Sequence, residues 1–422
     1  MNVRRKQQIR YILADIISSE LVWLCFLLFR WLVYEGRVWG WENILIPAFD
    51  FRLPLLVYPL VCLFVYYLSG YYLRPFQKPL WREFLRTFIS AIVIALFFFF
   101  VIIIDDKVVS YQRYLFSLLV LFGLQFVLSY IPRLFITLLT RRQGISRTRT
   151  IHSLEEAKQL VAGEQEEVII DLPSNYTDEQ LYRIIAHLYP LTCEISMIPR
   201  VYDMLTGAAR IGQLNSPSLI QITEHHMTDA ELCIKRAFDI VCAAVGLVIM
   251  SPLFLVISIL VRCSSAGPVV YRQKRMGQYG LPFTIFKFRT MIENAEEDGP
   301  QVTHDGDPRI TPVGRWLRKY RLDEWPQLWN ILRGDMSIVG PRPERPFFVK
   351  QIMEKAPYYC LLYKVRPGLT SWGPIRVGYT DTMDKMIERL NCDVVYVENM
   401  SLLLDLKILF FTIGVILRGK GR

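Results

Sequence analysis

Four apolar runs, each close to the length of a membrane-spanning helix, occupy the first third of this 422-residue chain. A helix needs about 20 mainly apolar residues to cross the hydrocarbon core of a bilayer. The runs cover residues 11–33, 53–73, 84–104 and 114–138. They predict a transmembrane four-helix bundle over residues 1–145. Pro132 and Arg133 interrupt the fourth run and predict a kink or an early end of that helix.

Basic residues orient the predicted bundle. They gather at the N-terminus, in the second loop and after the fourth run, whereas the other two loops mix acids with bases. Cytoplasmic loops carry the excess of Lys and Arg, so both ends of the bundle are expected in the cytoplasm. The basic residues are Arg4, Arg5, Lys6 and Arg10; Arg74, Lys78, Arg82 and Arg86; and Arg141, Arg142, Arg147 and Arg149.

Residues 146–224 have the composition of a soluble segment. The stretches EVIIDLP and CEISMIP each predict a buried strand, and TDEQLYRIIAHLYP between them predicts a helix with Thr177 or Asp178 as N-cap. Together they predict a small α/β module with a parallel sheet. The segment has no glycine-rich phosphate-binding loop. We therefore expect a structural or regulatory module rather than a nucleotide site.

A further apolar run, residues 240–260, is also long enough to cross the membrane. Ser251 and Pro252 lie in its middle, where proline removes a backbone hydrogen bond and bends a helix. A full crossing would also place the following Lys- and Arg-rich residues outside the cytoplasm, against the charge bias of the loops. Residues 235–262 therefore predict a re-entrant helix that bends at Ser251-Pro252 and returns to the cytoplasmic face.

The C-terminal region, residues 232–422, is basic and punctuated by Gly and Pro. Its last apolar stretch, residues 401–417, contains Asp405 and Lys407 and predicts a helix on the membrane surface. The whole chain carries a net charge of +10. Beside long apolar runs, such a charge is typical of loops that face anionic lipids or phosphorylated substrates, and no nucleic-acid-binding motif accompanies it. The expected fold class is a membrane protein that combines helices with α/β structure.

Asp323 and Glu324 stand just before WPQLWNIL, whose apolar spacing predicts a helix. Acids at the start of a helix often only complement the helix dipole. Here they are surrounded in the sequence by cations, which suits a site that handles phosphate groups. The cations are Arg315, Arg318, Lys319, Arg321, Arg333 and Arg342. Arg342 also lies between two prolines, which stiffen the backbone around it.

At these residues the chain resembles the bacterial sugar transferases, which are polyprenyl-phosphate sugar-1-phosphate transferases with a monotopic catalytic core. The matching segments run in family order from residue 232 to residue 417. They read KRAFD, GPVVYRQKRMG, FTIFKFRTM, DPRITPVGRWLRK, LDEWPQLWNILRGDMSIVGPRP, VRPGLTSW and CDVVYVENMSLLLDLKIL. The bundle and the α/β module resemble those of long-form members, which begin the synthesis of capsule, exopolysaccharide or O-antigen.

The resemblance implies a reaction and a set of roles. A sugar 1-phosphate would pass from a UDP-sugar to undecaprenyl phosphate, with release of UMP, at the cytoplasmic face of the bacterial inner membrane. Asp323 matches the family nucleophile and Glu324 its partner acid, and the two would bind Mg²⁺. The positions matched to substrate binding are Lys287, Arg318, Arg342 and Asp393, and those matched to the break in the re-entrant helix are Ser251 and Pro252.

The chemistry of the acceptor supports a carboxylate nucleophile independently. A phosphate monoester is mostly ionised at pH 7, so it needs no general base to activate it. A carboxylate beside the donor diphosphate is therefore better used to attack the sugar-bearing phosphate and to hold an acyl phosphate. Cations around it would stabilise the charge of the transition state.

The match departs from the family at residues 371–382, SWGPIRVGYTDT, where family members commonly carry a Gly-Trp-Ala-Gln-Val-Asn-Gly-Arg run. This leaves the identity of the sugar open, and the oligomeric state is open as well, with a homodimer among the alternatives. A non-catalytic membrane scaffold or regulator is a second function, against which the intact acid pair argues. A transporter is a third, which the few polar residues of the predicted membrane helices disfavour, chiefly Asp15 and Glu20.

Overall fold

The computed structural model separates into two compact units, which are described one at a time. The first contains residues 1–145 and 228–234, and the second contains residues 146–227 and 235–422. The residues that the structure describes are 3–30, 32–33, 52–73, 80–105, 111–142, 148–161, 167–173, 176–199, 219–223, 226–293, 295, 299, 306–378 and 382–417. Of the basic residues that orient the predicted bundle, Arg74, Lys78 and Arg147 lie outside these ranges.

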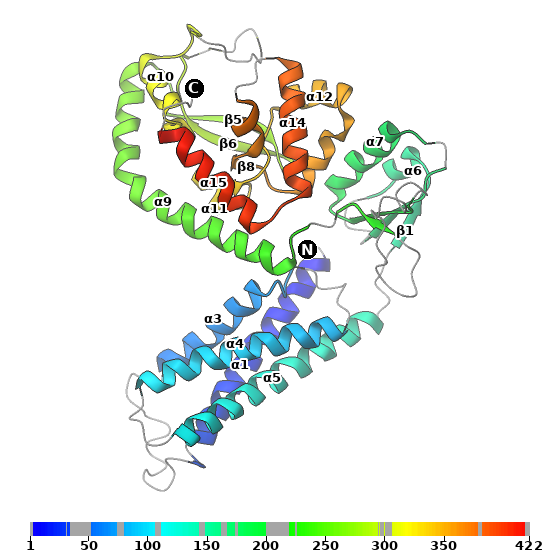
Figure 1. The fold of residues 1–422 in the computed structure, drawn as a ribbon, viewed down its shortest axis with the longest axis vertical. Coiled ribbons are helices and arrows are strands. Elements are labelled where there is room, and N and C mark those ends of the chain that lie inside the picture. The colour runs from blue at the N-terminus through cyan, green and yellow to red at the C-terminus, as the bar shows by residue number, and fades with distance from the viewer. Residues whose placement is uncertain are drawn as a thin grey trace. The chain divides into compact units, whose positions relative to one another are not determined.

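Four apolar helices form the N-terminal bundle, as the sequence predicts (Figure 1). They are α1 (Val3–Arg30), α3 (Arg52–Leu68), α4 (Leu80–Asp105) and α5 (Tyr111–Arg142). Aromatic rings fill the core of the bundle: the Trp23 ring centroid lies 5.0 Å from that of Tyr58, which lies 4.5 Å from that of Phe98. The outward residues are large and apolar and remain exposed, which is the pattern of helices that face lipid.

Membrane-spanning length and composition are found in four of the described helices, but these are not the four of the bundle. The apolar stretches are 7–30 in α1, 80–101 in α4, 115–139 in α5 and all of α9 (Asp229–Ser264). Helix α3 is shorter, with 17 residues, which is at the lower limit for a crossing.

A fully buried ion pair ties α1 to α5 inside the bundle. Arg133 Nε lies 2.7 Å from Asp15 Oδ1, and both side chains are 0% exposed. The guanidinium also lies over the rings of Tyr66 and Tyr71, at 3.7 and 4.0 Å from their centroids. Helix α5 continues through Pro132 to Arg142, so the prediction of an early end there is wrong. The helix tolerates Arg133 because the charge of this residue is paired inside the bundle. An unpaired guanidinium in lipid would be energetically costly.

The α/β module forms a four-stranded sheet in the order β1-β2-β3-β4. Its strands are β1 (Thr148–Ile151), β2 (Glu167–Ile170), β3 (Glu194–Met197) and β4 (Ile220–Gln221), with the first three parallel and β4 antiparallel to β3. The sequence predicts only β2 and β3, because β1 is largely exposed and lacks an apolar pattern. Helix α6 (Leu154–Lys158) follows β1, and α7 (Asp178–Leu188) follows β2. Thr177 caps α7 through a complete capping box with Gln180.

The long helix α9 leads into the C-terminal region. It is continuous through Pro252, and Figure 1 shows its ribbon changing direction partway along its length. Both halves pack against the same domain: Ala243 and Leu247 lie in one apolar cluster with Leu328, whereas Ile257 and Val261 lie in another with Phe288. The opposite face of α9 keeps its apolar side chains exposed, and Val248 is 73% exposed.

The C-terminal region combines short helices with two small sheets. The strands are β5 (Val270–Met276) and β6 (Pro282–Phe288), which are antiparallel, and β7 (Ser337–Val339) and β8 (Gly368–Thr370), which are parallel. The α-helices after α9 are α10 (Pro312–Lys319), α11 (Gln327–Arg333), α12 (Pro346–Lys355), α13 (Trp372–Val377), α14 (Met383–Glu398) and α15 (Leu402–Leu417). The 3₁₀ helices here are η4 (Gln278–Gly280), η5 (Leu322–Glu324) and η6 (Pro357–Lys364).

The acidic residue in the first turn of α15, Asp405, points into the C-terminal domain. Asp405 Oδ2 lies 2.5 Å from Lys235 Nζ, and Asp405 Oδ1 accepts a hydrogen bond from the Tyr396 hydroxyl at 2.7 Å. Its outward face carries exposed Leu403 and Phe410. Asp405 is therefore turned into the domain, whereas Lys407 and large apolar side chains of α15 remain exposed.

Removing the Asp15 carboxylate should reveal how much stability is lost when the charge of Arg133 is buried without its partner. We expect Asp15→Ala to lower the free energy of unfolding by about 3–5 kcal/mol, because Arg133 would remain buried without a partner. Thermal unfolding of the protein in detergent measures this. The matched control is Asp15→Ala with Arg133→Met, which removes both charges and should recover most of the loss; equal stability of the single and double variants would contradict the ion-pair argument.

Candidate active site

The two acids singled out in the sequence lie on η5, one turn before α11. Both side chains are about nine-tenths buried. The residue before η5, Arg321, has a φ of 53° in the left-handed region, which side chains other than glycine adopt at a cost. This strained residue turns the chain from α10 into η5 and brings both carboxylates against β6.

Glu324 is surrounded by three cations. Lys287 Nζ lies 2.8 Å from Glu324 Oε1, Arg342 Nη2 lies 3.7 Å from the same oxygen, and Arg321 Nη1 lies 3.6 Å from Oε2. Burial alone would raise the pKa of Glu324, but the charges of these cations outweigh it and hold the pKa below its usual range. Glu324 is thus ionised and fixed in place between three segments of the chain.

Asp323 has the opposite environment. Burial and the neighbouring negative charge of Glu324 raise its pKa to about 6, despite the opposing charges of Lys287 and Arg318. Within the part of the chain that the structure describes, no hydrogen bond or ion pair occupies its carboxylate. A carboxylate that is poorly solvated and unpaired is well suited to act as a nucleophile.

The cations come from separate elements. Lys287 projects from β6, and burial lowers its pKa. Arg318 lies in the last turn of α10 and donates from Nε to Thr290 Oγ1 at 2.8 Å, which fixes its orientation. Arg342 lies in the loop after β7, with 29% of its side chain exposed. The structure therefore brings three of the predicted substrate-binding residues, Lys287, Arg318 and Arg342, close to Asp323 and Glu324, and it adds Arg321 as a further cation.

The loop that carries Arg342 is held by buried contacts on both sides. Asp393 accepts hydrogen bonds from the backbone N–H of Arg342 at 3.2 Å, the Ser371 hydroxyl at 2.5 Å and the backbone N–H of Gly373 at 2.9 Å. Burial raises the pKa of Asp393, against the effect of these donors. Its carboxylate is thus bound by protein groups, so Asp393 holds the backbone of Arg342 instead of facing the acid pair.

Glycines allow the strand pair beneath this loop. Gly340 follows β7 and Gly368 begins β8, and a Cβ atom built on Gly368 would lie 2.1 Å from the backbone nitrogen of Gly340. No residue other than glycine fits at such an approach. The close approach of the two backbones fixes where the proline-flanked loop starts.

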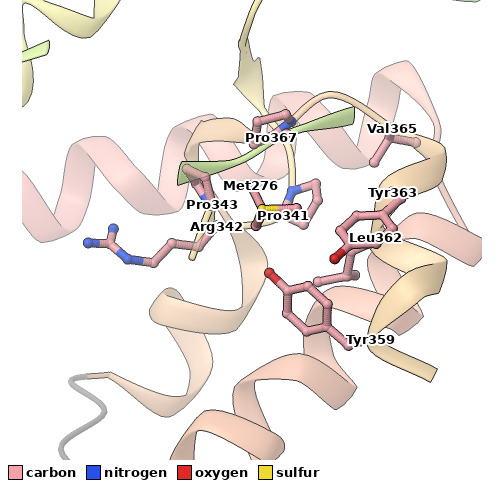
Figure 2. A pocket seen from close by; sticks show the side chains of 10 residues that line it. Met276, Pro341, Arg342, Pro343, Tyr359, Leu362, Tyr363, Val365 and Pro367 are labelled. Atoms are coloured by element: carbon pink, nitrogen blue, oxygen red, sulfur yellow. The ribbon is translucent and has the colours of Figure 1, made fainter. Parts of the chain in front are cut away.

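A small pocket lies behind the same loop, and its lining is mostly apolar (Figure 2). The residues that line it are Met276, Gly277, Pro341, Arg342, Pro343, Tyr359, Leu362, Tyr363, Val365 and Pro367. Figure 2 shows the guanidinium of Arg342 directed away from the rings of Tyr359 and Tyr363. The charge of Arg342 is therefore presented to the acid pair and not to the pocket.

Two supporting residues were not singled out in the sequence. Arg275 on β5 donates to the Pro343 carbonyl at 3.1 Å and lies 3.7 Å from Glu344, and Arg389 on α14 also binds Glu344. Arg275 and Arg389 belong to segments rich in other charged residues. Only the contact with the Arg342 loop distinguishes them, and that contact depends on the tertiary structure.

Ser251 and Pro252 lie away from this group, in the middle of α9, and both are exposed. The Ser251 hydroxyl donates to the Val248 carbonyl at 2.8 Å, a back-bond of the kind that accompanies helix bending. Helix α9 is continuous at this position, so the break stays a prediction. Ser251 and Pro252 make no contribution to the charges around Asp323.

Comparisons with known proteins find similarity in the region of the chain that contains this site. Residues 230–419 match the family model described as bacterial sugar transferase. A UDP-N-acetylgalactosamine-undecaprenyl-phosphate N-acetylgalactosaminephosphotransferase of Aeromonas hydrophila is 37% identical over 60% of this chain and 59% of its own length. The UDP-glucose:undecaprenyl-phosphate glucose-1-phosphate transferase of Escherichia coli (strain K12) is 37% identical over 55% of this chain and 50% of its own length.

A shorter relative is covered more fully. The UDP-glucose:undecaprenyl-phosphate glucose-1-phosphate transferase of Caulobacter vibrioides is 42% identical over 43% of this chain and 69% of its own length. By contrast, the chain spans only about half the length of the Escherichia coli relative. The similarity is thus concentrated in the C-terminal region that contains the acid pair.

The opposite pKa shifts of the two acids predict opposite effects on stability in protein free of divalent ions. At pH 7, Asp323→Asn should raise the free energy of unfolding by about 1–3 kcal/mol, because it removes a buried charge that folding disfavours. The gain should vanish as the pH falls from 6 towards about 4, where folded wild-type protein has taken up the proton.

The matched variant is Glu324→Gln, which leaves Lys287 without its partner and should cost about 3 kcal/mol. Thermal unfolding between pH 4 and pH 8 measures both effects. A loss of stability of the same size in both variants would contradict the assignment of the two environments.

Proposed function

The chain belongs to the bacterial sugar transferase family, and we propose that it transfers a sugar 1-phosphate from a UDP-sugar to undecaprenyl phosphate. The observation that carries this proposal is the arrangement of Asp323, buried and unpaired, beside Glu324, which three cations hold ionised. The products are a lipid diphosphate sugar and UMP. Such a product is the first membrane-bound intermediate of a capsule, exopolysaccharide or O-antigen.

In the first step the Asp323 carboxylate attacks the sugar-bearing phosphorus of the donor. The bond to the bridging oxygen breaks, UMP departs with the electron pair, and an acyl phosphate that carries the sugar remains on Asp323. Two features favour this role: the carboxylate has no competing protein partner in the described residues, and its raised pKa increases its basicity. Arg342 and Lys287 stand where they stabilise negative charge on the transferred phosphate.

In the second step the phosphate of the lipid attacks the acyl phosphate. A phosphorus–oxygen bond to the lipid forms, the bond to Asp323 breaks, and the carboxylate is restored. No proton has to be removed, because the lipid phosphate is already ionised at neutral pH. The site accordingly contains acids and cations and does not depend on a histidine.

The donor set fits a magnesium ion, with Asp323 and Glu324 as its protein ligands. Mg²⁺ is commonly held by one or two carboxylates together with substrate phosphates and water. Among the described residues, no group of three or more acidic, His or Cys side chains forms a complete metal cage, so substrate oxygens would complete the coordination. When bound, the ion offsets the repulsion between the carboxylates and the donor phosphates.

The packing of α9 supports a domain that rests on one face of the membrane. Residues of both halves of α9 contact the C-terminal domain, and so do polar groups near both ends: Lys235 donates to the Val339 carbonyl, and Arg289 donates to the Ser265 carbonyl. A helix that crossed the bilayer would carry its two ends about 30 Å apart on opposite sides. We infer that α9 enters the cytoplasmic leaflet and returns, with exposed α15 side chains at the same surface.

This placement suits the two substrates. The donor is soluble in water, whereas the phosphate of the acceptor lies at the depth of the lipid head groups. The inner bacterial membrane, with the C-terminal domain in the cytoplasm, is the location where both are present. The sugar is the least determined part, since relatives of similar identity act on N-acetylgalactosamine and glucose donors.

Loss of the nucleophile tests the reaction. Purified protein with Mg²⁺ and undecaprenyl phosphate should release UMP from at least one member of a panel of UDP-sugars, and Asp323→Asn should abolish this release. Without lipid, the wild-type protein should retain labelled sugar phosphate on Asp323 in an acid-quenched digest. Absence of UMP release by the wild-type protein from every UDP-sugar would favour a non-catalytic scaffold, and full activity of Asp323→Asn would exclude Asp323 as the nucleophile. Activity without any trapped adduct would favour direct transfer.

A reporter tests the topology separately. A fusion after Arg422 should report the cytoplasm, because α9 returns to the face from which it enters. The matched variant Pro252→Leu should shift part of the population to the periplasmic side, since it removes the residue that bends α9. A periplasmic signal from the wild-type fusion would overturn the re-entrant arrangement.

A further inference from the structure

We propose that Arg236, on the second turn of α9, is a positioning residue that places the acid pair by binding the C-terminal end of α11. This inference rests on the proposed transfer of sugar phosphate at Asp323. Arg236 Nη1 donates to the Ile331 carbonyl at 2.7 Å, and Nη2 donates to the Leu332 carbonyl at 3.1 Å. Nothing in the spacing of the sequence connects Arg236 with the acid pair.

The end of α11 needs such a donor. The last carbonyls of a helix lack their regular partner one turn on. The Ile331 carbonyl accepts from the Gly334 N–H at 3.1 Å as well as from Arg236, whereas the donor to the Leu332 carbonyl among the described residues is Arg236. A cation there also complements the helix dipole. Gly334, with a φ of 99°, ends α11 and leaves open space beside Arg236, whose Nη2 lies 3.5 Å from where a Cβ atom would be. The planar fork of the guanidinium binds two successive carbonyls, a geometry that a single ammonium cannot reproduce.

Helix α11 transmits this anchor to the catalytic groups. It has only seven residues and begins three residues after Glu324. Asn330, within α11, accepts a hydrogen bond from the backbone N–H of Phe286 and donates to the Thr284 carbonyl, so α11 is also bonded to the strand that carries Lys287. A shift of α11 along α9 would therefore move Asp323, Glu324 and Lys287 together.

The neighbouring residues of α9 hold the other side of the site. Asp239 accepts a hydrogen bond from the backbone N–H of Ile338 at 3.0 Å, and Lys235 donates to the Val339 carbonyl at 2.9 Å. These contacts fix β7, which leads directly into the loop of Arg342. The segment KRAFD of α9 thus contacts both β7, which leads to the loop of Arg342, and α11, which follows the acid pair. Arg236 makes the contact with α11.

The test compares two conservative variants at the two ends of α9. Arg236→Lys keeps the charge but loses the fork, and we expect kcat for UMP release to fall by about 10- to 100-fold, as small misplacements of reacting groups do. The KM for the UDP-sugar should change less than kcat, since Arg318 and Arg342, the other cations proposed to bind the donor, lie on separate elements. The control is Arg262→Lys, an exposed arginine of α9 that donates to one carbonyl, of Gly267; its kcat and KM should match those of wild-type protein.

Two outcomes would overturn the proposal. A wild-type kcat in Arg236→Lys would mean that a positive charge at this position is sufficient and that the contact with two carbonyls is not needed. A loss expressed in KM with kcat unchanged would mean that Arg236 acts on donor binding. Arg236→Gln, which is uncharged and donates to one carbonyl, should show a larger fall in kcat than Arg236→Lys.

A second measurement does not depend on catalysis. In Arg236→Lys protein, the rise in unfolding temperature caused by Asp323→Asn should be smaller than in the wild-type background, because the carboxylate would no longer be held in its buried position. Additive effects of the two substitutions would contradict the coupling. If wild-type protein releases no UMP from any UDP-sugar, the proposed function fails, while this comparison still decides the role of Arg236.

Discussion

The pairing of Glu324 with Lys287 is the interaction on which the active site depends. It joins η5 to β6, and Arg342 and Arg321 extend it to the loop after β7 and to the end of α10. Burying a carboxylate is costly unless opposite charges compensate it. Here the ion pairs described above are made with Glu324, and burial together with the negative charge of Glu324 raises the pKa of Asp323. One acid holds the site together, and the other is left available for chemistry.

The same separation of structural and reactive groups continues outward from the acid pair. Asp393 binds backbone groups of the Arg342 loop, and Arg275 binds the Pro343 carbonyl. Neither contributes a free charge, yet both decide where Arg342 stands. The proposed site binds a charged donor and a charged acceptor, so its cations have to be held in place. Unrestrained Arg and Lys side chains would instead form ion pairs with the nearest carboxylate. The cations that remain partly exposed are those that a diphosphate can reach.

The sequence predicts the parts of this protein in which a residue's role follows from its neighbours in the chain. Apolar runs predict the bundle helices, and the apolar spacing of WPQLWNIL predicts α11, with the acid pair near its start. Other features depend on tertiary contacts. Arg133 in an apolar run predicts an interruption of α5, and only the distant carboxylate of Asp15 explains why the helix continues. Strand β1 lacks an apolar pattern because it is an edge strand that is largely exposed. Asp393 resembles a substrate ligand in the sequence, but the structure shows its carboxylate occupied by protein donors.

Helix α9 has to satisfy two demands at once, and its residues divide accordingly. Its exposed apolar face suits lipid, whereas Ala243, Ile257 and their neighbours pack into the domain. The polar residues of its first turns are directed at backbone groups of β7 and α11. A helix that only anchored the domain would need no such contacts, since apolar packing would suffice. In the proposed re-entrant arrangement, the direct bonds between α9 and the segments that carry Asp323 and Arg342 would make the depth of α9 in the bilayer set the height of the reacting groups above it. In the proposed reaction the acceptor phosphate stands at the membrane surface, so that height decides whether the two substrates meet.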